Sequence, residues 1–179
     1  MLRKIFMAAA MLTFSSYHVQ AQNGLDLENV LYLDLEVGRV SILLRPDLAP
    51  NTVARVKELA RSGFYDGLTF HRVIEGFMAQ GGDPAGNGTG GSGQKLDAEF
   101  TRTPHLRGTV SMARAADDEN SADSQFFIVF NRIPQLDNDY TVFGRVFGGM
   151  EFVDQINRGE PPLEPTKIVK IQVAADVKE

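Results

Sequence analysis

The sequence predicts a mainly β fold of short strands with two helices, arranged as a barrel or a sandwich. Apolar and polar residues alternate over residues 31–36 and again over 40–44, on either side of a short turn, which is typical of a β-hairpin. Further short apolar runs follow along the chain, separated by glycine, proline and polar residues. Short strands at this spacing favour a sheet that closes on itself or two packed sheets.

The first two strands are predicted at residues 31–36 and 40–44, joined by a turn at Gly38-Arg39. The other strands are predicted at residues 70–74, 77–81, 99–100, 109–113, 125–130, 142–146 and 168–173. A helix is expected from Pro50 to Ser62-Gly63, with an apolar face made by Val53, Val56, Leu59 and Ala60. A second helix is expected after Gly148-Gly149, with Met150, Val153 and Ile156 at helical spacing.

The first 21 residues have the organisation of a secretory signal peptide. A basic start at Arg3-Lys4 precedes an apolar run over residues 5–14 and a polar stretch that ends in Val19-Gln20-Ala21. The apolar run is shorter than the roughly 20 residues that span a bilayer, so a retained signal anchor is the less favoured alternative. We therefore expect cleavage after Ala21, one domain at residues 22–179 and no stable membrane insertion after signal removal. The expected location is the periplasm, with secretion from the cell as the alternative.

Composition excludes several classes of function. The chain has no cysteine, which excludes thiol catalysis and cysteine metal sites, and a domain of this length can bury enough core to fold without disulfides. Loss of Arg3 and Lys4 with the signal peptide leaves 16 basic against 23 acidic residues, a net charge of −7. A chain this acidic is not expected to bind nucleic acid.

The most informative segment runs from Phe70 to Asp83, because it combines a fixed positive charge, an amide and two large apolar residues. In a strand, Phe70, Arg72 and Ile74 would share one face, opposite His71 and Val73. In the next extended segment, Phe77 and Ala79 would lie opposite Met78 and Gln80. An arginine among apolar neighbours either reaches solvent or acts as a donor at the edge of an apolar pocket.

Three other patterns resemble functional motifs but are better explained as structural features. The glycines of residues 86–91 match a dinucleotide fingerprint, and Gly88 to Lys95 nearly matches a phosphate loop, but no helical pattern follows to hold a phosphate. His71 and His105 lack metal-ligand spacing and are interpreted as satisfied structural histidines, so no metal is expected. A hydrolase triad of His71 with Ser111 or Ser124 is disfavoured, because the sequence has no Gly-x-Ser-x-Gly elbow.

Five ordered groups of residues together resemble the cyclophilins, the peptidyl-prolyl cis-trans isomerases. They are Phe70-His71-Arg72 with residues 76–83, then Gly88-Thr89-Gly90-Gly91, Ser111-Met112-Ala113, residues 124–128, and Val142-Phe143-Gly144. The resemblance extends from about Leu31 to Val173. It implies a closed eight-stranded antiparallel β-barrel with a helix at each end and a site on the outer surface.

The resemblance also implies the reaction and its residues. The reaction is rotation of X-Pro bonds in unfolded or exported polypeptides, which assists their folding and needs no cofactor. Arg72 matches the catalytic arginine of the family, with Gln80 and Phe77 as the other catalytic residues, and arginine stays charged near neutral pH. The matching substrate-binding residues are Met78, Ala113, Arg114, Ala115, Gln125, Phe127, Leu136 and Tyr140.

Four departures from the family pattern are present. Gln135 stands where many members have tryptophan, which predicts weak binding of the inhibitor cyclosporin, and Tyr140 stands where many have histidine. Arg114 replaces a frequent asparagine, but the matching strip acts largely through its main chain. The segment 116–123 is longer and more acidic than in well-known eukaryotic members. The changes at Gln135 and Tyr140 indicate the bacterial exported branch.

Two classes of function stay open from the sequence. The first is an isomerase, which the complete set of Arg72, Phe77 and Gln80 favours. The second is a proline-peptide-binding chaperone or scaffold with little turnover, which would use the same groove. No long heptad pattern or exposed apolar stretch is evident, and a monomer is expected.

Overall fold

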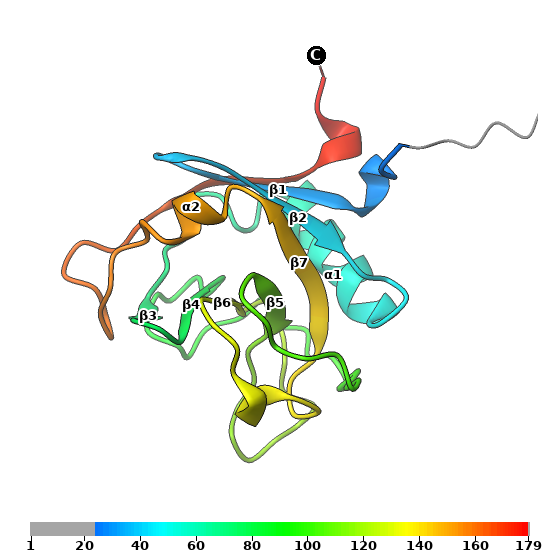
Figure 1. Cartoon of the computed structure of the whole chain (residues 1–179), viewed down its shortest axis with the longest axis vertical. Helices are drawn as coiled ribbons and strands as arrows, with labels where there is room; N and C mark the ends of the chain where they lie inside the picture. The colour runs from blue at the N-terminus through cyan, green and yellow to red at the C-terminus, as the bar shows by residue number, and fades with distance from the viewer. Residues whose placement is uncertain (1–23, 179) are drawn as a thin grey trace, which may run out of the picture.

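Residues 24–178 are described by the computed structural model, and the predicted signal peptide lies outside this range. Eight strands form one antiparallel sheet in the order β3-β4-β6-β5-β7-β2-β1-β8. They are β1 (Val30–Leu35), β2 (Gly38–Leu44), β3 (Arg72–Ile74), β4 (Met78–Gly81), β5 (Thr109–Met112), β6 (Phe126–Val129), β7 (Val142–Gly148) and β8 (Ile168–Val173). The sheet curls from β1 and β2 through β7 to the shorter strands β3 to β6 (Figure 1).

The expected closed barrel is wrong, because the sheet is open between β3 and β8 and has the form of a half-barrel. One antiparallel bridge, between Thr69 and Lys167, and three backbone hydrogen bonds join residues 67–70 to residues 166–168 without forming a ladder between β3 and β8. β3 has three residues, and its free edge is taken by the loop after α2 (Met150–Val153), where Gly159 pairs with Val73. The edge of β3 is therefore covered without closing the ladder.

The predicted hairpin is confirmed, with its turn two residues earlier than expected. Gly38 and Arg39 already pair with Leu35 and Asp34 of β1, so the turn consists of residues 36 and 37. The alternating apolar residues of both strands, including Leu33 and Ile42, are buried in the core.

The strand predicted at residues 99–100 is absent from the described structure, and Glu99 has another role. Its carboxylate accepts hydrogen bonds from the backbone N–H groups of Asn51 (3.0 Å) and Thr52 (2.9 Å) at the start of α1 (Pro50–Arg61). The residue before the helix, Ala49, has no side-chain oxygen that could accept these bonds. The long-range cap replaces a local one.

Both predicted helices are present and pack against the sheet, but the second ends at Val153 and does not reach Ile156. The apolar face of α1 is buried as predicted, and the helix contacts β8. α2 is a single turn against β2, and it begins after Gly149, which has φ +79°. A Cβ atom at Gly149 would lie 2.3 Å from the carbonyl oxygen of Arg39, so only glycine fits there. Three short 3-10 helices complete the fold: η1 (Leu27–Asn29), η2 (Pro134–Leu136) and η3 (Ala174–Asp176).

Apolar residues form two separate clusters on the two faces of the sheet. The large inner cluster joins α1, the inward residues of the strands and Tyr65, Phe70 and Phe143. The small outer cluster consists of Met78, Phe127, Val129 and Leu136, with Phe77 and Tyr140 packed against it. Within residues 24–178, no helix is both long enough and apolar enough to cross a membrane.

Candidate active site

Arg72, Gln80 and Phe127 lie side by side on the outer face of the sheet, because their strands are in register. The β3–β4 pairing sets Arg72 opposite Gln80, and the β4–β6 pairing sets Gln80 opposite Phe127. The neighbouring residues Val73 and Ala79 point into the inner cluster, as strand alternation predicts. The central part of the predicted segment thus has one face in the core and one at the surface.

Two predicted orientations within this segment are wrong. Phe70 belongs to the inner core rather than the face of Arg72, because β3 begins only at Arg72 and Phe70 precedes the regular alternation. Phe77 lies in the turn between β3 and β4 and packs beside Met78, not on the face of Ala79. The turn therefore adds Phe77 to the outer cluster.

A small cavity of about 100 Å³ opens on the outer cluster. Phe77, Met78 and Phe127 supply apolar walls, and the Tyr140 ring meets Phe127 edge-on at 5.5 Å between centroids. We call this cavity the apolar pocket. Its complete lining is Arg72, Phe77, Met78, Gln80, Ala113, Arg114, Phe127, Leu136 and Tyr140, all of which were predicted as site residues.

A chain of hydrogen bonds runs from Arg72 across the sheet. Nη1 of Arg72 lies 3.4 Å from Oε1 of Gln80, and Nε2 of Gln80 donates to Oε1 of Gln125 at 2.9 Å. Nε2 of Gln125 donates in turn to the carbonyl oxygens of Gly88 (3.0 Å) and Gly90 (2.8 Å). Since carbonyl oxygens only accept, they fix which end of each amide faces its neighbour. Gln80 consequently presents an acceptor to Arg72.

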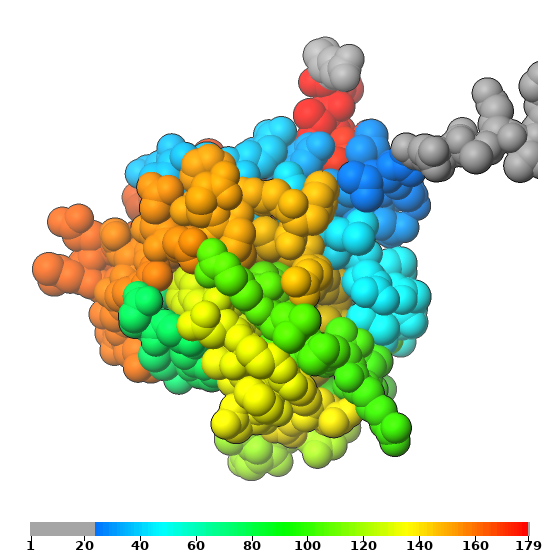
Figure 2. Space-filling model, viewed as in Figure 1, coloured from blue at the N-terminus to red at the C-terminus, as the bar shows by residue number. Residues whose placement is uncertain are grey.

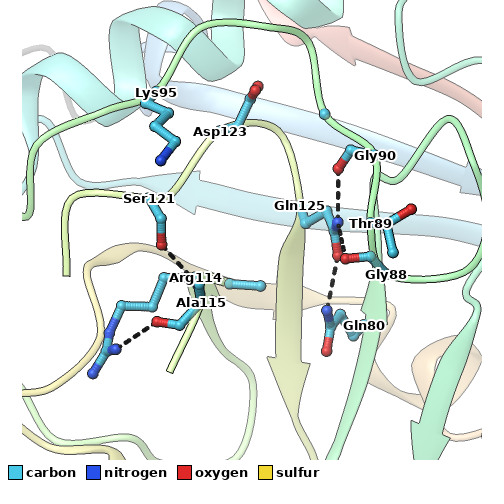
Figure 3. Close-up of a pocket in the computed structure, with 12 residues that line it drawn as sticks. Gln80, Gly88, Thr89, Gly90, Lys95, Arg114, Ala115, Ser121, Asp123 and Gln125 are labelled. Atoms are coloured by element: carbon cyan, nitrogen blue, oxygen red, sulfur yellow. Dashed lines mark hydrogen bonds between the residues drawn. The ribbon is translucent and has the colours of Figure 1, made fainter. Parts of the chain in front are cut away.

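A larger cavity of about 350 Å³ adjoins the apolar pocket, with Gln80, Ala113 and Arg114 common to both (Figure 3). The other two predicted site residues, Ala115 and Gln125, line this larger cavity. Figure 3 shows Gln125 between Gln80 and the glycine loop, with Lys95, Asp123 and Ser121 on the opposite side. Its other lining residues are Gly88, Thr89, Gly90 and Gly91.

The glycine-rich segment is a loop held by a buried carboxylate. Asp83 accepts backbone hydrogen bonds from Ala85 (2.8 Å) and Asn87 (3.0 Å), and it also accepts one from Gly88. Burial alone would raise the pKa of Asp83, but these backbone bonds outweigh burial and lower it. No helix follows the loop within the described residues, so the dinucleotide and phosphate interpretations fail for lack of a helix N-terminus. No cluster of metal-ligating side chains occurs among residues 24–178.

Comparison with known protein families shows which family the chain belongs to. The family model described as cyclophilin type peptidyl-prolyl cis-trans isomerase/CLD matches residues 31–173, which is most of the chain. The chain belongs to the cyclophilin family. It is accordingly a peptidyl-prolyl cis-trans isomerase.

Individual relatives agree with the family. This cyclophilin is 46% identical over 194 residues to a probable peptidyl-prolyl cis-trans isomerase of Brucella suis, covering 99% of this chain and 98% of the relative. It is 48% identical over 132 residues to peptidyl-prolyl cis-trans isomerase B of Bacillus subtilis, covering 72% and 91% of the two chains.

Solved cyclophilin structures have the same fold. The cyclophilin AquaCyp293 of Hirschia baltica superposes with a TM-score of 0.79 at 30% identity, covering 86% of this chain and 77% of that chain. A Cryptosporidium parvum cyclophilin, solved in the presence of the dipeptide Ala-Pro, gives a TM-score of 0.75 at 30% identity, covering 80% and 98%. Cyclophilins bind proline-containing peptides.

Sequence reasoning missed a buried polar group beneath the apolar pocket of this cyclophilin. The His105 ring stacks on Phe127 with 6.2 Å between centroids, Nδ1 lies 3.2 Å from Oδ1 of Asp137, and Nε2 lies 2.9 Å from Oγ of Ser111. Because a carboxylate only accepts, these partners assign the proton to Nδ1, and the Ser111 hydroxyl donates to Nε2. His105 is thus the satisfied structural histidine that was predicted.

The charges of this group are set by burial and hydrogen bonding. Burial lowers the pKa of His105, and the bond to Asp137 offsets that effect only in part. Burial would raise the pKa of Asp137, but hydrogen bonds from Arg132 and His105 outweigh it and lower the pKa to about 2. His105 is therefore neutral and Asp137 ionised near neutral pH.

Ser111, His105 and Asp137 have the residue types of a hydrolase triad but not the access that one needs. Ser111 and His105 are both 0% exposed, so a substrate cannot reach the hydroxyl. The pairing considered from the sequence, with His71, does not occur. The prediction for His71 is wrong in another respect, since this buried ring has no hydrogen-bond partner for either nitrogen within residues 24–178.

Arg114 and Gln135, two of the departures from the family pattern, lie at or next to the apolar pocket. The Arg114 side chain is 7% exposed, donates to Oδ1 of Asp139 at 2.6 Å and lies over the Tyr140 ring at 4.9 Å, so it is held beside Tyr140. Gln135 is exposed beside Leu136 and is not among the residues that line the apolar pocket.

Sequence reasoning also missed Glu160, which contacts Arg72 directly. Oε2 of Glu160 accepts a hydrogen bond from Nε of Arg72 at 2.7 Å. The two residues are 88 positions apart in the sequence. No local pattern around Glu160 indicates that it contacts Arg72. Only the folded path of the loop after α2 brings them together.

Proposed function

We propose that Arg72 is the transition-state donor of this cyclophilin, with Gln80 and Phe77 as the other catalytic residues. Rotation of an X-Pro bond must break amide resonance, which for peptide bonds gives a barrier of about 18–20 kcal/mol. When the C–N bond twists, the proline nitrogen regains a lone pair that a guanidinium N–H can bind. An interaction made only in the twisted state lowers the barrier without a nucleophile or a cofactor.

The observation that carries this proposal is the position of the Arg72 guanidinium at the wall of the apolar pocket. Nε is engaged by Glu160 and Nη1 by Gln80, whereas Nη2 has no hydrogen-bond partner among residues 24–178. The side chain is 40% exposed, so a bound peptide can reach it. A donor that is oriented by two neighbours and free on its third nitrogen suits transition-state binding.

The apolar residues have the complementary role of anchoring the proline ring. Met78, Phe127, Leu136 and Tyr140 surround a volume suited to a pyrrolidine ring, and aromatic and thioether groups pack well against it. The main chain of residues 113–115 and the side chain of Gln125 would bind the flanking peptide. The Cryptosporidium parvum relative solved with Ala-Pro supports a proline-containing peptide as the ligand.

Substitution of Arg72 tests the proposal against binding without turnover. Removal of one transition-state donor costs about 10² to 10³ in rate, so Arg72→Ala should lower kcat/KM for a proline tetrapeptide by that factor. Arg39→Ala is the matched control, since Arg39 is similarly exposed and pairs with Asp34 at 2.6 Å. An unchanged rate in Arg72→Ala would remove Arg72 from the mechanism. A wild type that binds the peptide without turnover would instead favour a chaperone or scaffold.

We further propose that this cyclophilin belongs to the bacterial exported branch, with a signal peptide at residues 1–21 and a periplasmic mature domain at 22–179. The basic, apolar and small-residue order of the N-terminus supports export. Unfolded and newly exported polypeptides would be its substrates. The mass of the exported form tests cleavage after Ala21, and cell fractionation separates a periplasmic from a secreted protein.

The mature domain is proposed to act as a monomer. The described surface carries large apolar side chains only at scattered positions, such as Leu163 and Phe147. Light scattering at several protein concentrations gives the mass in solution, and a dimer mass would contradict this proposal.

A further inference from the structure

Backbone pairing fixes Glu160 opposite Arg72. The N–H of Val73 donates to the carbonyl of Gly159 at 2.8 Å, and the N–H of Gly159 donates back to Val73 at 2.9 Å. In an antiparallel pair, this exchange sets the next residues, Arg72 and Glu160, directly across from each other on one face. Because β4 sets Gln80 opposite Arg72 on the other edge, the guanidinium has a register-defined partner on each side.

A second ion pair holds the same loop against the β3–β4 turn. Nε of Arg158 donates to Oε2 of Glu75 at 2.7 Å, and the Arg158 guanidinium lies 4.4 Å from the centroid of the Phe130 ring. Figure 2 shows the loop after α2, in orange, against the green β3–β4 turn. Glu160 is therefore presented by an anchored segment.

A third cavity, of about 330 Å³, opens between Glu160 and the glycine loop. It shares Arg72 and Gln80 with the apolar pocket, so a peptide with its proline in that pocket can extend a neighbouring side chain into the third cavity. His71 lines the cavity as a buried ring. The other lining residues are Gly86, Asn87, Gly88 and Pro161.

Glu160 offers a carboxylate oxygen to a cation in the third cavity. Oε2 of Glu160 is bound to Arg72, whereas Oε1 has no hydrogen-bond partner among residues 24–178. The Glu160 side chain is 51% exposed, and Arg72, the cationic residue that also lines the cavity, is already paired with it. A substrate ammonium or guanidinium group can bind the free oxygen without displacing Arg72. A substrate carboxylate would be repelled by Glu160 and would compete with it for Arg72, the donor that isomerisation needs.

We infer that Glu160 is a specificity-determining residue that favours substrates with lysine or arginine next to the prolyl bond and disfavours acidic residues there. The inference rests on the proposed function, because it takes the apolar pocket as the proline site and Arg72 as the donor. Exposed ion pairs are worth about 0.2–1 kcal/mol, so a selectivity of roughly 1.5- to fivefold between lysine and glutamate peptides is expected.

Two peptide series test the inference, one with lysine, glutamine or glutamate before the proline and one with the same residues after it. The kcat/KM ratio of the lysine to the glutamate peptide is measured for wild type, Glu160→Gln and Glu58→Gln. Glutamine at 160 keeps an acceptor for Arg72 but loses the charge. Glu58 is the matched control, because its exposed carboxylate also pairs with an arginine but lines none of the three cavities.

In at least one series, Glu160→Gln should lower the lysine-to-glutamate ratio by roughly 1.5- to fivefold, and Glu58→Gln should leave it unchanged. Added salt should reduce the wild-type ratio, because the pair is exposed. Equal ratios for wild type and Glu160→Gln in both series would overturn the inference. Failure of the proposed mechanism has a different signature, since Arg72→Ala would then keep its rate on every peptide whatever the charge ratio.

Discussion

At the residue scale, the orientation of two side-chain amides decides whether Arg72 faces an acceptor or a donor. Gln125 donates to two glycine carbonyls, and Gln80 therefore turns its oxygen toward Arg72. If either amide were reversed, Arg72 would face an NH₂ group and lose an acceptor. The glycine loop thus positions the arginine through two intermediate side chains.

Gln125→Ala tests this arrangement at a single residue. Alanine removes the acceptor for Nε2 of Gln80, so Gln80 loses its fixed orientation and can turn its NH₂ group toward Arg72. Loss of one hydrogen bond of about 0.5–1.5 kcal/mol corresponds to a fall in kcat of roughly two- to tenfold. Steady-state kinetics should show this fall, and an exposed control, Gln155→Ala, should match the wild type. A Gln125→Ala variant with wild-type kcat would refute the orienting role.

Protonation of His105 links stability to pH. Burial lowers the pKa of His105 in the folded chain below its ordinary value of 6.5. As pH falls below 6.5, the unfolded chain binds a proton that the folded chain does not, so the free energy of unfolding decreases. Urea unfolding between pH 7 and 5 should show a loss of stability. His105→Gln should have a shallower loss, with the buried His71 responsible for part of what persists.

The contribution of His105 is separable from that of the carboxylates. The low pKa of Asp137, about 2, means that its contribution to stability is present above its ordinary value of 3.8 and is lost only as pH falls toward 2. The two windows do not overlap between pH 7 and 5. An unchanged slope in His105→Gln over that range would contradict a neutral buried histidine.

At the element scale, α1 depends on a residue outside the helix. Its N-terminal N–H groups donate to Glu99, and the hydroxyl of Thr52 donates to the same carboxylate at 2.7 Å. A negative charge at a helix N-terminus also interacts favourably with the helix dipole. The absence of a local cap at Ala49 leaves Glu99 as the acceptor for this end.

Glu99→Ala should therefore destabilise the protein by about 1–2 kcal/mol, the typical cost of a lost cap. The free energy of unfolding from urea titration gives the value. Glu58→Ala is the control, because Glu58 lies on α1 in an exposed pair with Arg55. Equal stabilities of the two variants would show that Glu99 does not act as a cap.

At the scale of the whole molecule, one face of the sheet packs the inner core and the other face carries the candidate site. The inner cluster includes Phe70, Phe143 and the buried face of α1, whereas the outer cluster is small and opens to the surface. Substitutions of exposed side chains around the apolar pocket, such as Arg72→Ala, remove no packing from the inner cluster. Activity and stability can thus be altered separately.

The sequence predicts local structure well where periodicity is strong. The β1–β2 hairpin, the apolar face of α1 and the alternation of Met78, Ala79 and Gln80 follow from side-chain spacing alone. The open sheet does not, because closure depends on whether β3 pairs with β8 or with the loop around Gly159.

Some residues of the candidate site are predictable from the sequence, and others are not. The family resemblance predicts every residue that lines the apolar pocket; six of them lie within its contiguous motifs, whereas Arg114, Leu136 and Tyr140 lie outside those motifs. Glu160 and the group of His105, Ser111 and Asp137 were missed, because their contacts join segments without a shared pattern. Contacts of this kind are fixed by register and packing rather than by local sequence.

The central claim is that Arg72 binds the twisted amide and not the planar ones. Its most direct test compares the Kd of a proline peptide with the isomerisation rate of the bound peptide, both by NMR, in wild type and Arg72→Ala. An interaction made only in the transition state leaves Kd nearly unchanged while the bound-state rate falls about 10² to 10³-fold. A Kd weakened as much as kcat/KM, with an unchanged bound-state rate, would contradict the account.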